Sequence, residues 1–336
     1  MKKFGRQTVM LPSKPAFAAT AAVVGKKEGE GPLKKCFDHI SEDSYFGQSS
    51  WEKAEVHMLR HSFQLCCEKA KLSPASLDYV FSGDLLNQCI SSAFAMKECG
   101  IPYFGMYGAC STMAESLSLA AMLIDGDFAE NVCAVTGSHF CTAERQYRFP
   151  LEYGGQRPPT AQWTVTGAGA AILQRGGKGP GISYVTTGKI VDAGINDTNN
   201  MGAAMAPAAF DTLKAHFADT GRSPDYYDAI ITGDLGALGH DILEALFRQE
   251  GIDLGAQYMD CGVLMYDLAT QDVFSGGSGC GCCASVLCGH IVPAMERGVW
   301  QRVLFAATGA LMSPTSAQQG DTIPGICHAV AIEMEG

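Results

Sequence analysis

The chain repeats itself, and this internal repeat limits the folds it can adopt more than any other feature. The segment DYVFSGDLL (78–86) recurs as DAIITGDLG (228–236), and in each an apolar strand runs into a small residue, Gly, Asp and Leu. A helical run that ends in a Ser-Pro turn precedes both segments, as EVHMLRHSFQLCCEKAKLSP and FDTLKAHFADTGRSP. Apolar residues recur in both runs at three- and four-residue steps, as on one face of a helix.

A second pair of segments follows in the same order. Residues 107–138 align without gaps to residues 279–310, so that NVCAVTGS stands opposite VLFAATGA. Two matching pairs in the same order indicate two homologous halves. We predict that these halves are an N-terminal unit, 1–180, and a C-terminal unit, 181–336.

Each half alternates short apolar strands with helices. The expected strands are 78–83, 103–107, 131–137, 168–173, 227–232, 302–308 and 327–334, and the expected helices are 50–70, 87–99, 111–124, 208–219, 238–250 and 283–297. Continuous apolar strands are buried on both faces, which implies parallel or mixed sheets covered by helices. The helices that start near Cys110 and Cys282 should then meet near a pseudo-two-fold axis, with a pocket between them.

Composition excludes several classes of protein. The net charge of −11 argues against nucleic acid as a partner, because phosphate binding needs clustered Lys and Arg. No apolar run reaches the roughly 18 residues that span a bilayer, so no transmembrane segment is expected. The 14 cysteines show neither a disulfide framework nor paired zinc-ligand spacing, which indicates buried free thiols and no metal site.

Three segments resemble the ketoacyl synthase III-like members of the thiolase fold. YGACSTMAESLSLAAMLIDG (107–126) is similar to their nucleophile helix, VTGAGAAIL (165–173) to the strand after their active-site loops, and GGSGCGCCASV (276–286) to the glycine-rich turn that carries their catalytic Asn. The resemblance implies two pseudo-symmetric βαβαβαββ halves that form a five-layer αβαβα sandwich. It places Cys110 at the nucleophile position.

A narrower resemblance rests on longer strings. FGQSSWEKAE, SGDLLNQ, FGMYGACSTMAESL, TAERQYRFPLEYGGQ and MGAAMAPAAFDTLK together resemble the stage V sporulation protein AD family from end to end. This implies a sporulation protein that binds dipicolinic acid, alone or with Ca²⁺, and needs no cofactor. It implies work with membrane proteins of the same operon to bring dipicolinate into the developing spore. The expected location is peripheral, at the cytoplasmic side or surface of the forespore or spore inner membrane, and a homodimer is expected by analogy.

The resemblance also bears on whether Cys110 does chemistry. A condensing enzyme supports its thiolate with a His and an Asn that stabilise the oxyanion. The matching positions here hold Gly233 and Cys280, and neither residue replaces the lost donor. We therefore predict a non-catalytic binding protein. The alternatives are a ketoacyl synthase-like acyltransferase with Cys110 as nucleophile, and a scaffold for membrane partners that needs no ligand.

Dipicolinate carries two carboxylates, which directs attention to groups that bind anions. A helix start presents free N–H groups, so Cys110, Ser111 and Thr112 are candidate ligand residues, with Ser278 as their counterpart in the second half.

Charged residues and a histidine complete the expected site. In the loop 138–158, Arg145 and Arg148 could pair a carboxylate, although Arg145 follows Glu144 and could instead serve a surface network. His139 is either a pocket donor or a structural histidine. Asp84 and Asp234, at the ends of the two repeated strands, are either helix caps or pocket residues that act through Ca²⁺.

Overall fold

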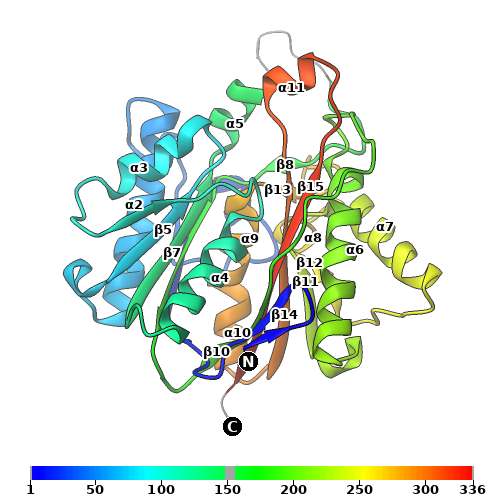
Figure 1. Ribbon diagram of the computed structural model, residues 1–336. Helices are drawn as coiled ribbons and strands as arrows, with labels where there is room; N and C mark the ends of the chain where they lie inside the picture. The colour runs from blue at the N-terminus through cyan, green and yellow to red at the C-terminus, as the bar shows by residue number, and fades with distance from the viewer. Residues whose placement is uncertain (1, 148–155, 335–336) are drawn as a thin grey trace.

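Most strands join in one large twisted sheet, and β8 (Trp163–Thr164) and β13 (Gly277–Ser278) pair with each other in a separate two-stranded sheet. The computed structural model describes residues 2–147 and 156–334 (Figure 1). The strands are β1 (Lys3–Phe4), β2 (Thr8–Met10), β3 (Ala16–Val24), β4 (His39–Ile40), β5 (Tyr79–Gly83), β6 (Tyr103–Gly105), β7 (Asn131–Ser138), β8 (Trp163–Thr164), β9 (Gly167–Gln174), β10 (Pro180–Thr186), β11 (Ala229–Thr232), β12 (Tyr258–Asp260), β13 (Gly277–Ser278), β14 (Arg302–Ala310) and β15 (Gly325–Met334).

Helices cover both faces of this sheet. They are α1 (Lys26–Gly29), α2 (Trp51–Ala70), α3 (Ile90–Met96), α4 (Thr112–Asp125), α5 (Phe140–Tyr147), α6 (Met201–Thr220), α7 (Gly236–Gln249), α8 (Cys261–Met265), α9 (Cys280–Val286), α10 (Val292–Glu296) and α11 (Pro314–Gln318). A π-helical turn, Leu287–Ile291, joins α9 to α10.

The strand order reflects the internal repeat. From one edge to the other the strands run β12-β11-β14-β15-β10-β3-β9-β7-β5-β6. Read outward from the centre, each half has the same pattern: two antiparallel pairings, then two parallel ones. The halves meet where β10 pairs antiparallel with β3. The repeated segments thus occupy equivalent places, with β5 matching β11 and β7 matching β14.

The elements stack in five layers, as predicted. Helices α4 and α9 lie in the middle, where α4 packs on strands of both halves and α9 packs on β7 and β9. Helix α2 covers the outer face of the first half, and α6, with α7 against it, covers that of the second (Figure 1). The three large apolar clusters fill the spaces between these layers. Strands buried on both faces explain why their sequences read as continuous apolar runs. The division of the chain near residue 180 stays a prediction.

The predicted helix 87–99 is shorter in the structure, where a 3-10 turn, Asn87–Cys89, precedes α3. Two other predicted helices differ in extent from those observed. Helix α6 starts seven residues before the predicted 208, since the Asn200 side chain caps it by accepting from the N–H of Ala203 and the helix continues through Pro207. The predicted helix 283–297 begins at Cys280 and is interrupted by the π-helical turn. Both differences come from local features that apolar periodicity does not report.

The innermost strand of each half, where the two halves meet, is absent from the predicted strands. The segment AFAATAAVV forms β3, nearly all of it buried, between α2 and α9. Its alanines have low intrinsic strand propensity, but small side chains allow helices to approach the sheet closely on both faces. β10 is the matching strand of the second half, and it is likewise missing from the prediction.

Candidate functional site

The start of α4 is a tight turn whose own side chains use its hydrogen-bonding groups. Ala109 takes a left-handed conformation with φ of 50°, which is strained for a residue with a Cβ. The Ser111 hydroxyl donates to the carbonyl oxygen of Gly108 at 2.7 Å, and the Thr112 hydroxyl donates to that of Ala109 at 2.6 Å. Both residues are fully buried. They shape the turn that presents Cys110 and do not line the pocket in front of it.

The pocket lies beside the turns that precede α4 and α9, and α5 and several connecting segments complete its walls. The space free of atoms in and in front of it is about 640 Å³, which includes open solvent. Cys110 and Ser278 are the predicted site residues that line it. The complete lining is Leu85, Tyr107, Ala109, Cys110, Ala143, Glu144, Tyr147, Gln162, Thr164, Thr198, Asn199, Met201, Ser278, Ala310 and Met312.

The environment of Cys110 opposes formation of a thiolate. The side chain is nearly buried, and its Sγ lies 3.9 Å from the Ser278 hydroxyl oxygen. Burial raises the pKa of the Cys110 thiol well above its usual range, and the negative charge of Asp234 raises it further. Among the described lining residues there is no Lys or Arg to offset this. A reactive cysteine needs the opposite, a cationic setting that lowers the thiol pKa.

Asp234 stands directly behind the pocket wall. Its carboxylate accepts from the Ser278 hydroxyl at 2.9 Å, the Gly279 N–H at 3.0 Å and the Thr308 hydroxyl at 2.8 Å. Burial raises the pKa of the Asp234 carboxyl, while these donors act in the opposite direction. The residue therefore fixes the turn before α9 and places a negative charge close to the pocket.

The two positions matched to the catalytic His and Asn of condensing enzymes offer no donor to a reacting group. A Cβ at Gly233 would lie 2.9 Å from both the Cα of Ala307 and the N of Thr308, which is too close without a shift of β14. Cys280 is fully buried beside Cys110, and its thiol donates to the carbonyl oxygen of Gly137 at 3.0 Å.

The cysteines of the α9 turn have separate surroundings. Cys280 shares a small apolar cluster with Cys110, whereas Cys282, the residue opposite Cys110 in the internal repeat, packs in the main core. All 14 cysteines are free. This agrees with the expectation of unpaired, mostly buried thiols.

Asp84 and His139 are held by other parts of the protein. The Asp84 carboxylate accepts from the N–H groups of Leu86 at 2.8 Å and Ser92 at 2.7 Å, so it organises the start of α3. His139 is buried, and its Nε2 lies 2.8 Å from the carbonyl oxygen of Ser44. It lines a second, more open cavity beside Lys27 and Trp163. Neither residue lines the pocket at Cys110.

Of the two predicted arginines, the structure describes Arg145, and this residue does not line the pocket. Arg145 pairs with Glu52, and its guanidinium lies over the ring of Trp51. Arg145 thus has a surface ion pair, but its partner is Glu52 and not the adjacent Glu144, which pairs with Arg157. Arg148 lies outside the described residues. Arg157 pairs with the lining residue Glu144 at 2.7 Å.

Several polar pocket residues are absent from the predicted site. Gln162 donates through Nε2 to the carbonyl oxygens of Asp234 at 2.6 Å and Gly277 at 2.9 Å. Thr164, Thr198 and Asn199 add two hydroxyls and an amide to the lining. They come from connecting segments without periodic patterns. The Asn-rich run NDTNN before α6 could have indicated a polar segment at a helix start, because Asn and Asp commonly cap helices.

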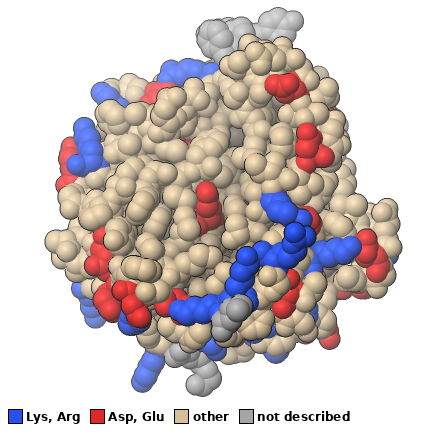
Figure 2. All heavy atoms as spheres, in the orientation of Figure 1, with Lys and Arg blue, Asp and Glu red and all other residues tan. Residues whose placement is uncertain are grey.

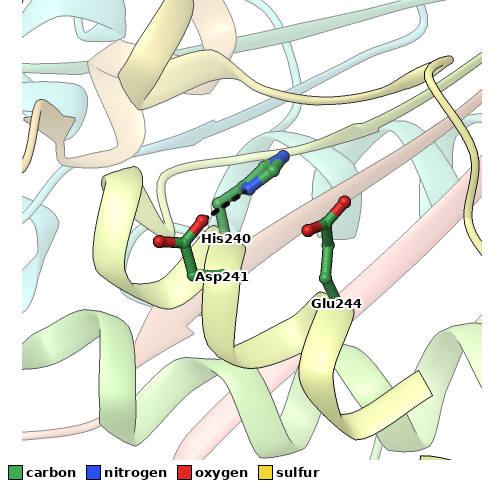
Figure 3. Close-up of side chains that lie close together, drawn as sticks. All are labelled: His240, Asp241 and Glu244. Carbon is green, nitrogen blue, oxygen red and sulfur yellow. Dashed lines mark hydrogen bonds and ion pairs between the residues drawn. The ribbon is translucent and has the colours of Figure 1, made fainter. Parts of the chain in front are cut away.

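A cluster with metal-ligand residue types lies away from the pocket, on α7. His240, Asp241 and Glu244 have ligand atoms within 4.8 Å of one another (Figure 3). Glu244 is already paired with Arg248 at 2.7 Å, and the His240 ring stacks on Tyr258. Figure 3 shows Asp241 pointing away from Glu244. Nothing else in the described chain directs a ligand to this cluster.

Comparison with known proteins agrees with the sequence resemblance. The family model described as Stage V sporulation protein AD (SpoVAD) matches residues 5–333. The Stage V sporulation protein AD of Bacillus subtilis (strain 168) is 43% identical over 337 residues, which covers 100% of this chain and 99% of that protein.

Solved structures support the thiolase fold. The 3-oxoacyl-[acyl-carrier-protein] synthase III of Aquifex aeolicus VF5 has a TM-score of 0.57 at 15% identity, over 95% of this chain and 99% of that one. A structure of OleA from Xanthomonas campestris with bound cerulenin has a TM-score of 0.61 at 13% identity, over 98% of this chain and 100% of that one. At such low identity the likeness concerns the fold alone, and it confirms the predicted fold class.

Proposed function

Because the chain belongs to the stage V sporulation protein AD family, we propose that this sporulation protein is a non-catalytic binding protein for dipicolinic acid, needed for its uptake into the developing spore. The observation that carries the proposal is the pocket at Cys110. It keeps the position of a condensing-enzyme active site, but the thiol faces a buried carboxylate, and the positions of the catalytic partners hold Gly233 and Cys280.

The pocket suits a flat ring with polar groups at its edge. Leu85, Met201 and Met312 offer apolar walls, and Thr164 and Asn199 offer polar groups. Ligand pockets typically combine mostly apolar walls with a few placed polar groups in this way.

The charge around the pocket favours a ligand that carries a cation. Glu144 lines the pocket, and Asp234 lies one hydrogen bond behind Ser278. A bare dicarboxylate meets repulsion from Asp234, whereas the charge of Glu144 is offset by its ion pair with Arg157. Its Ca²⁺ chelate is neutral, and Ca²⁺ favours oxygen ligands. We therefore propose that the Ca²⁺ chelate is the preferred ligand.

The same proposal includes a peripheral place at the inner membrane of the forespore or spore, with membrane proteins of the same operon as partners. In the described part of the chain, no helix combines the length and the apolar character that crossing a bilayer requires. Figure 2 shows Lys and Arg side chains gathered in a band across one face, over the N-terminal strands. Lys2, Lys3 and Arg6 are exposed in this region. An anionic lipid surface attracts such basic groups.

A homodimer is also part of the proposal. Strand β6 ends the sheet of the first half, and Tyr103 and Phe104 on it are substantially exposed. An unpaired apolar edge strand is a template for pairing with another chain, and a second copy can add its own β6 there. Light scattering of the wild-type protein and of a Phe104→Lys variant tests this: loss of a dimer in the variant supports it, and a monomeric wild type contradicts it.

Calorimetry tests the central proposal. The purified protein is titrated with dipicolinate, with and without Ca²⁺, beside a Met312→Trp variant that fills the pocket. A Phe128→Trp variant is the matched control, because Phe128 is exposed and away from the pocket. We expect saturable binding by wild type and control, and its loss in Met312→Trp. Absence of binding by the wild-type protein in both conditions would refute the proposal.

The acyltransferase alternative retains one supporting observation, the position of Cys110 at the start of α4 beside the pocket. Incubation with acyl-CoA or acyl carrier protein followed by intact mass measurement tests it. Stable acylation of Cys110 would favour this function, and an unmodified thiol excludes it.

The ligand-free scaffold makes a different prediction in cells. If the protein only holds its membrane partners together, spores with Met312→Trp will contain normal dipicolinate. If it binds the ligand, complex assembly will persist and spore dipicolinate will fall.

A further inference from the structure

Three histidines from two elements lie side by side on the outer face of the first half. His39 is on β4, and His57 and His61 are four residues apart on α2. The ring centres of His39 and His61 are 4.8 Å apart, and those of His57 and His61 are 5.9 Å apart. His61 thus stands between two other imidazoles, far from the pocket residues in sequence and on the opposite side of the sheet from α4.

These spacings match those of imidazoles that share one metal ion. With metal–nitrogen bonds of about 2.0–2.1 Å and tetrahedral angles, two bound rings have centres roughly 5–6 Å apart. The i, i+4 spacing of His57 and His61 puts both side chains on one face of the helix. The ring nitrogens do not all converge in this conformation. His39 and His57 are exposed, however, so their rings can turn toward a common point without disturbing the core.

The middle histidine has an unsatisfied nitrogen. The Nδ1 of His61 is buried and has no hydrogen-bond partner in the described chain. A buried polar atom without a partner costs about 1–3 kcal/mol. A metal ion held among the three rings would either bond this nitrogen directly or bond Nε2 and leave Nδ1–H to a water at the site.

The protonation states also suit a metal. Burial, followed by Arg60 and His39, lowers the pKa of His57, and burial, followed by His39 and His57, lowers that of His61. Neutral imidazoles are the form that binds metals. Arg60 points its guanidinium to the carbonyl oxygens of Phe94 and Ala95 and to Glu98, and Glu68 is the acidic group that acts on His61.

From this arrangement we propose that His39, His57 and His61 form a surface site for a divalent transition metal such as Zn²⁺, with water completing the coordination. Imidazole ligands suit Zn²⁺, Ni²⁺ and Cu²⁺, whereas Ca²⁺ prefers oxygen. The site is independent of the pocket and of its proposed ligand.

The chain provides a matched control for this proposal. The cluster of His240, Asp241 and Glu244 on α7 also has a histidine and a partner four residues later (Figure 3). Its Glu244 is taken by Arg248, and it has no second imidazole. His240→Gln therefore removes a histidine with comparable surroundings but no place in the proposed site.

The experiment measures Zn²⁺ binding to the wild-type protein, to His57→Gln, His61→Gln and His39→Gln, and to the His240→Gln control, by competition with a chromophoric chelator. The Co²⁺ visible spectrum reports the ligand type, which matters because Cys36 lies 3.8 Å from His290 and could bind metal itself. We expect one site with nitrogen ligands, and a loss of affinity of about tenfold or more in each of the three variants. His240→Gln should leave the affinity unchanged, and affinity should fall at acid pH as protons compete with the metal for the imidazoles.

Other outcomes overturn the proposal. These are equal Zn²⁺ affinity in wild type and His57→Gln, dependence on His240, or a Co²⁺ spectrum with thiolate bands. His57 and His39 are exposed, so their variants test the site even if His61→Gln folds poorly.

Discussion

Replacement of Asp234 by Asn tests the proposal that the pocket prefers the calcium chelate of dipicolinate to the bare dicarboxylate. The Asp234 carboxylate lies 2.9 Å from the Ser278 hydroxyl oxygen, and Ser278 lines the pocket. Because Ser278 donates its one hydroxyl proton to Asp234, a ligand carboxylate in van der Waals contact with Ser278 lies about 6 Å from the Asp234 charge. At an effective dielectric constant of about 20, the repulsion of two unit charges at this distance is about 3 kcal/mol.

This energy sets the expected size of the effect. Asn keeps the shape of Asp234 and can still accept from Gly279 N–H and Ser278, so we expect the fold to persist. Removal of about 3 kcal/mol of repulsion strengthens binding of Ca²⁺-free dipicolinate by up to about 100-fold. The neutral Ca²⁺ chelate should change far less. Isothermal titration calorimetry with and without Ca²⁺ measures both affinities.

The control is Asp127→Asn, which removes an exposed carboxylate that pairs with Arg175 away from the pocket lining. It should leave both affinities unchanged. Two results refute the reasoning for Asp234: a folded Asp234→Asn protein whose affinity for Ca²⁺-free dipicolinate is the same as that of wild type, or one in which both forms of the ligand gain equally. Either would mean that the ligand does not experience this charge.

Three further predictions concern stability and reactivity. Burial, followed by Asp84, raises the pKa of Glu55 well above its usual range. The protein is therefore most stable below about pH 4.5 with respect to this group, and it loses that stability as pH rises toward the raised pKa. Denaturant unfolding should show that Glu55→Gln stabilises the protein by about 1–3 kcal/mol near pH 8 and little near pH 5. Gly233→Ala should lower the unfolding free energy by about 1–3 kcal/mol, since the new Cβ meets the backbone of β14, and a melting temperature equal to that of wild type would contradict the packing described. Mass spectrometry after brief alkylation should find Cys110 modified more slowly than the half-buried Cys36 and Cys141, and preferential labelling of Cys110 would contradict its raised thiol pKa.

Much of the fold could be predicted because the two halves of the chain share the same sequence patterns. The paired segments located β5 and β11, β7 and β14, and the helices that start at the pocket. The repeat carries information that a single segment lacks, because an accidental pattern does not recur in the same order. The alanine-rich β3 was not predicted. Its strand conformation depends on contacts with two helices that are distant in the sequence.

The site was harder to predict than the fold. Cys110 and Ser278 line the pocket as expected, because both lie on elements that the repeat fixes. Ser111 and Thr112 have the expected positions, but their hydroxyls bond to the turn that holds them. Their sequence shows a polar group at a helix start, and it does not show that the backbone uses that group. Ligand contact by the other predicted residues stays a prediction.

Most of the pocket-lining residues that were not predicted from the sequence lie on loops. Gln162, Thr198 and Met312 reach the pocket from connections that have no periodic pattern. Their convergence depends on how the two halves pack, which is a property of the tertiary structure. A pocket made between repeated units is therefore less predictable than the units themselves.

The two aspartates of the repeated Gly-Asp-Leu segments have different hydrogen-bonding roles in the two halves. Asp84 accepts from two backbone N–H groups and organises the chain before α3. Asp234 instead holds Ser278, Gly279 and Thr308, and its charge faces Cys110. A condensing enzyme needs donors at this place, and here there is a buried acceptor. Under the proposed non-catalytic function, two donor side chains are missing, and the local field also opposes a thiolate at Cys110. The same proposal expects the pocket to accept a neutral, metal-chelated ligand and to repel a reacting anion.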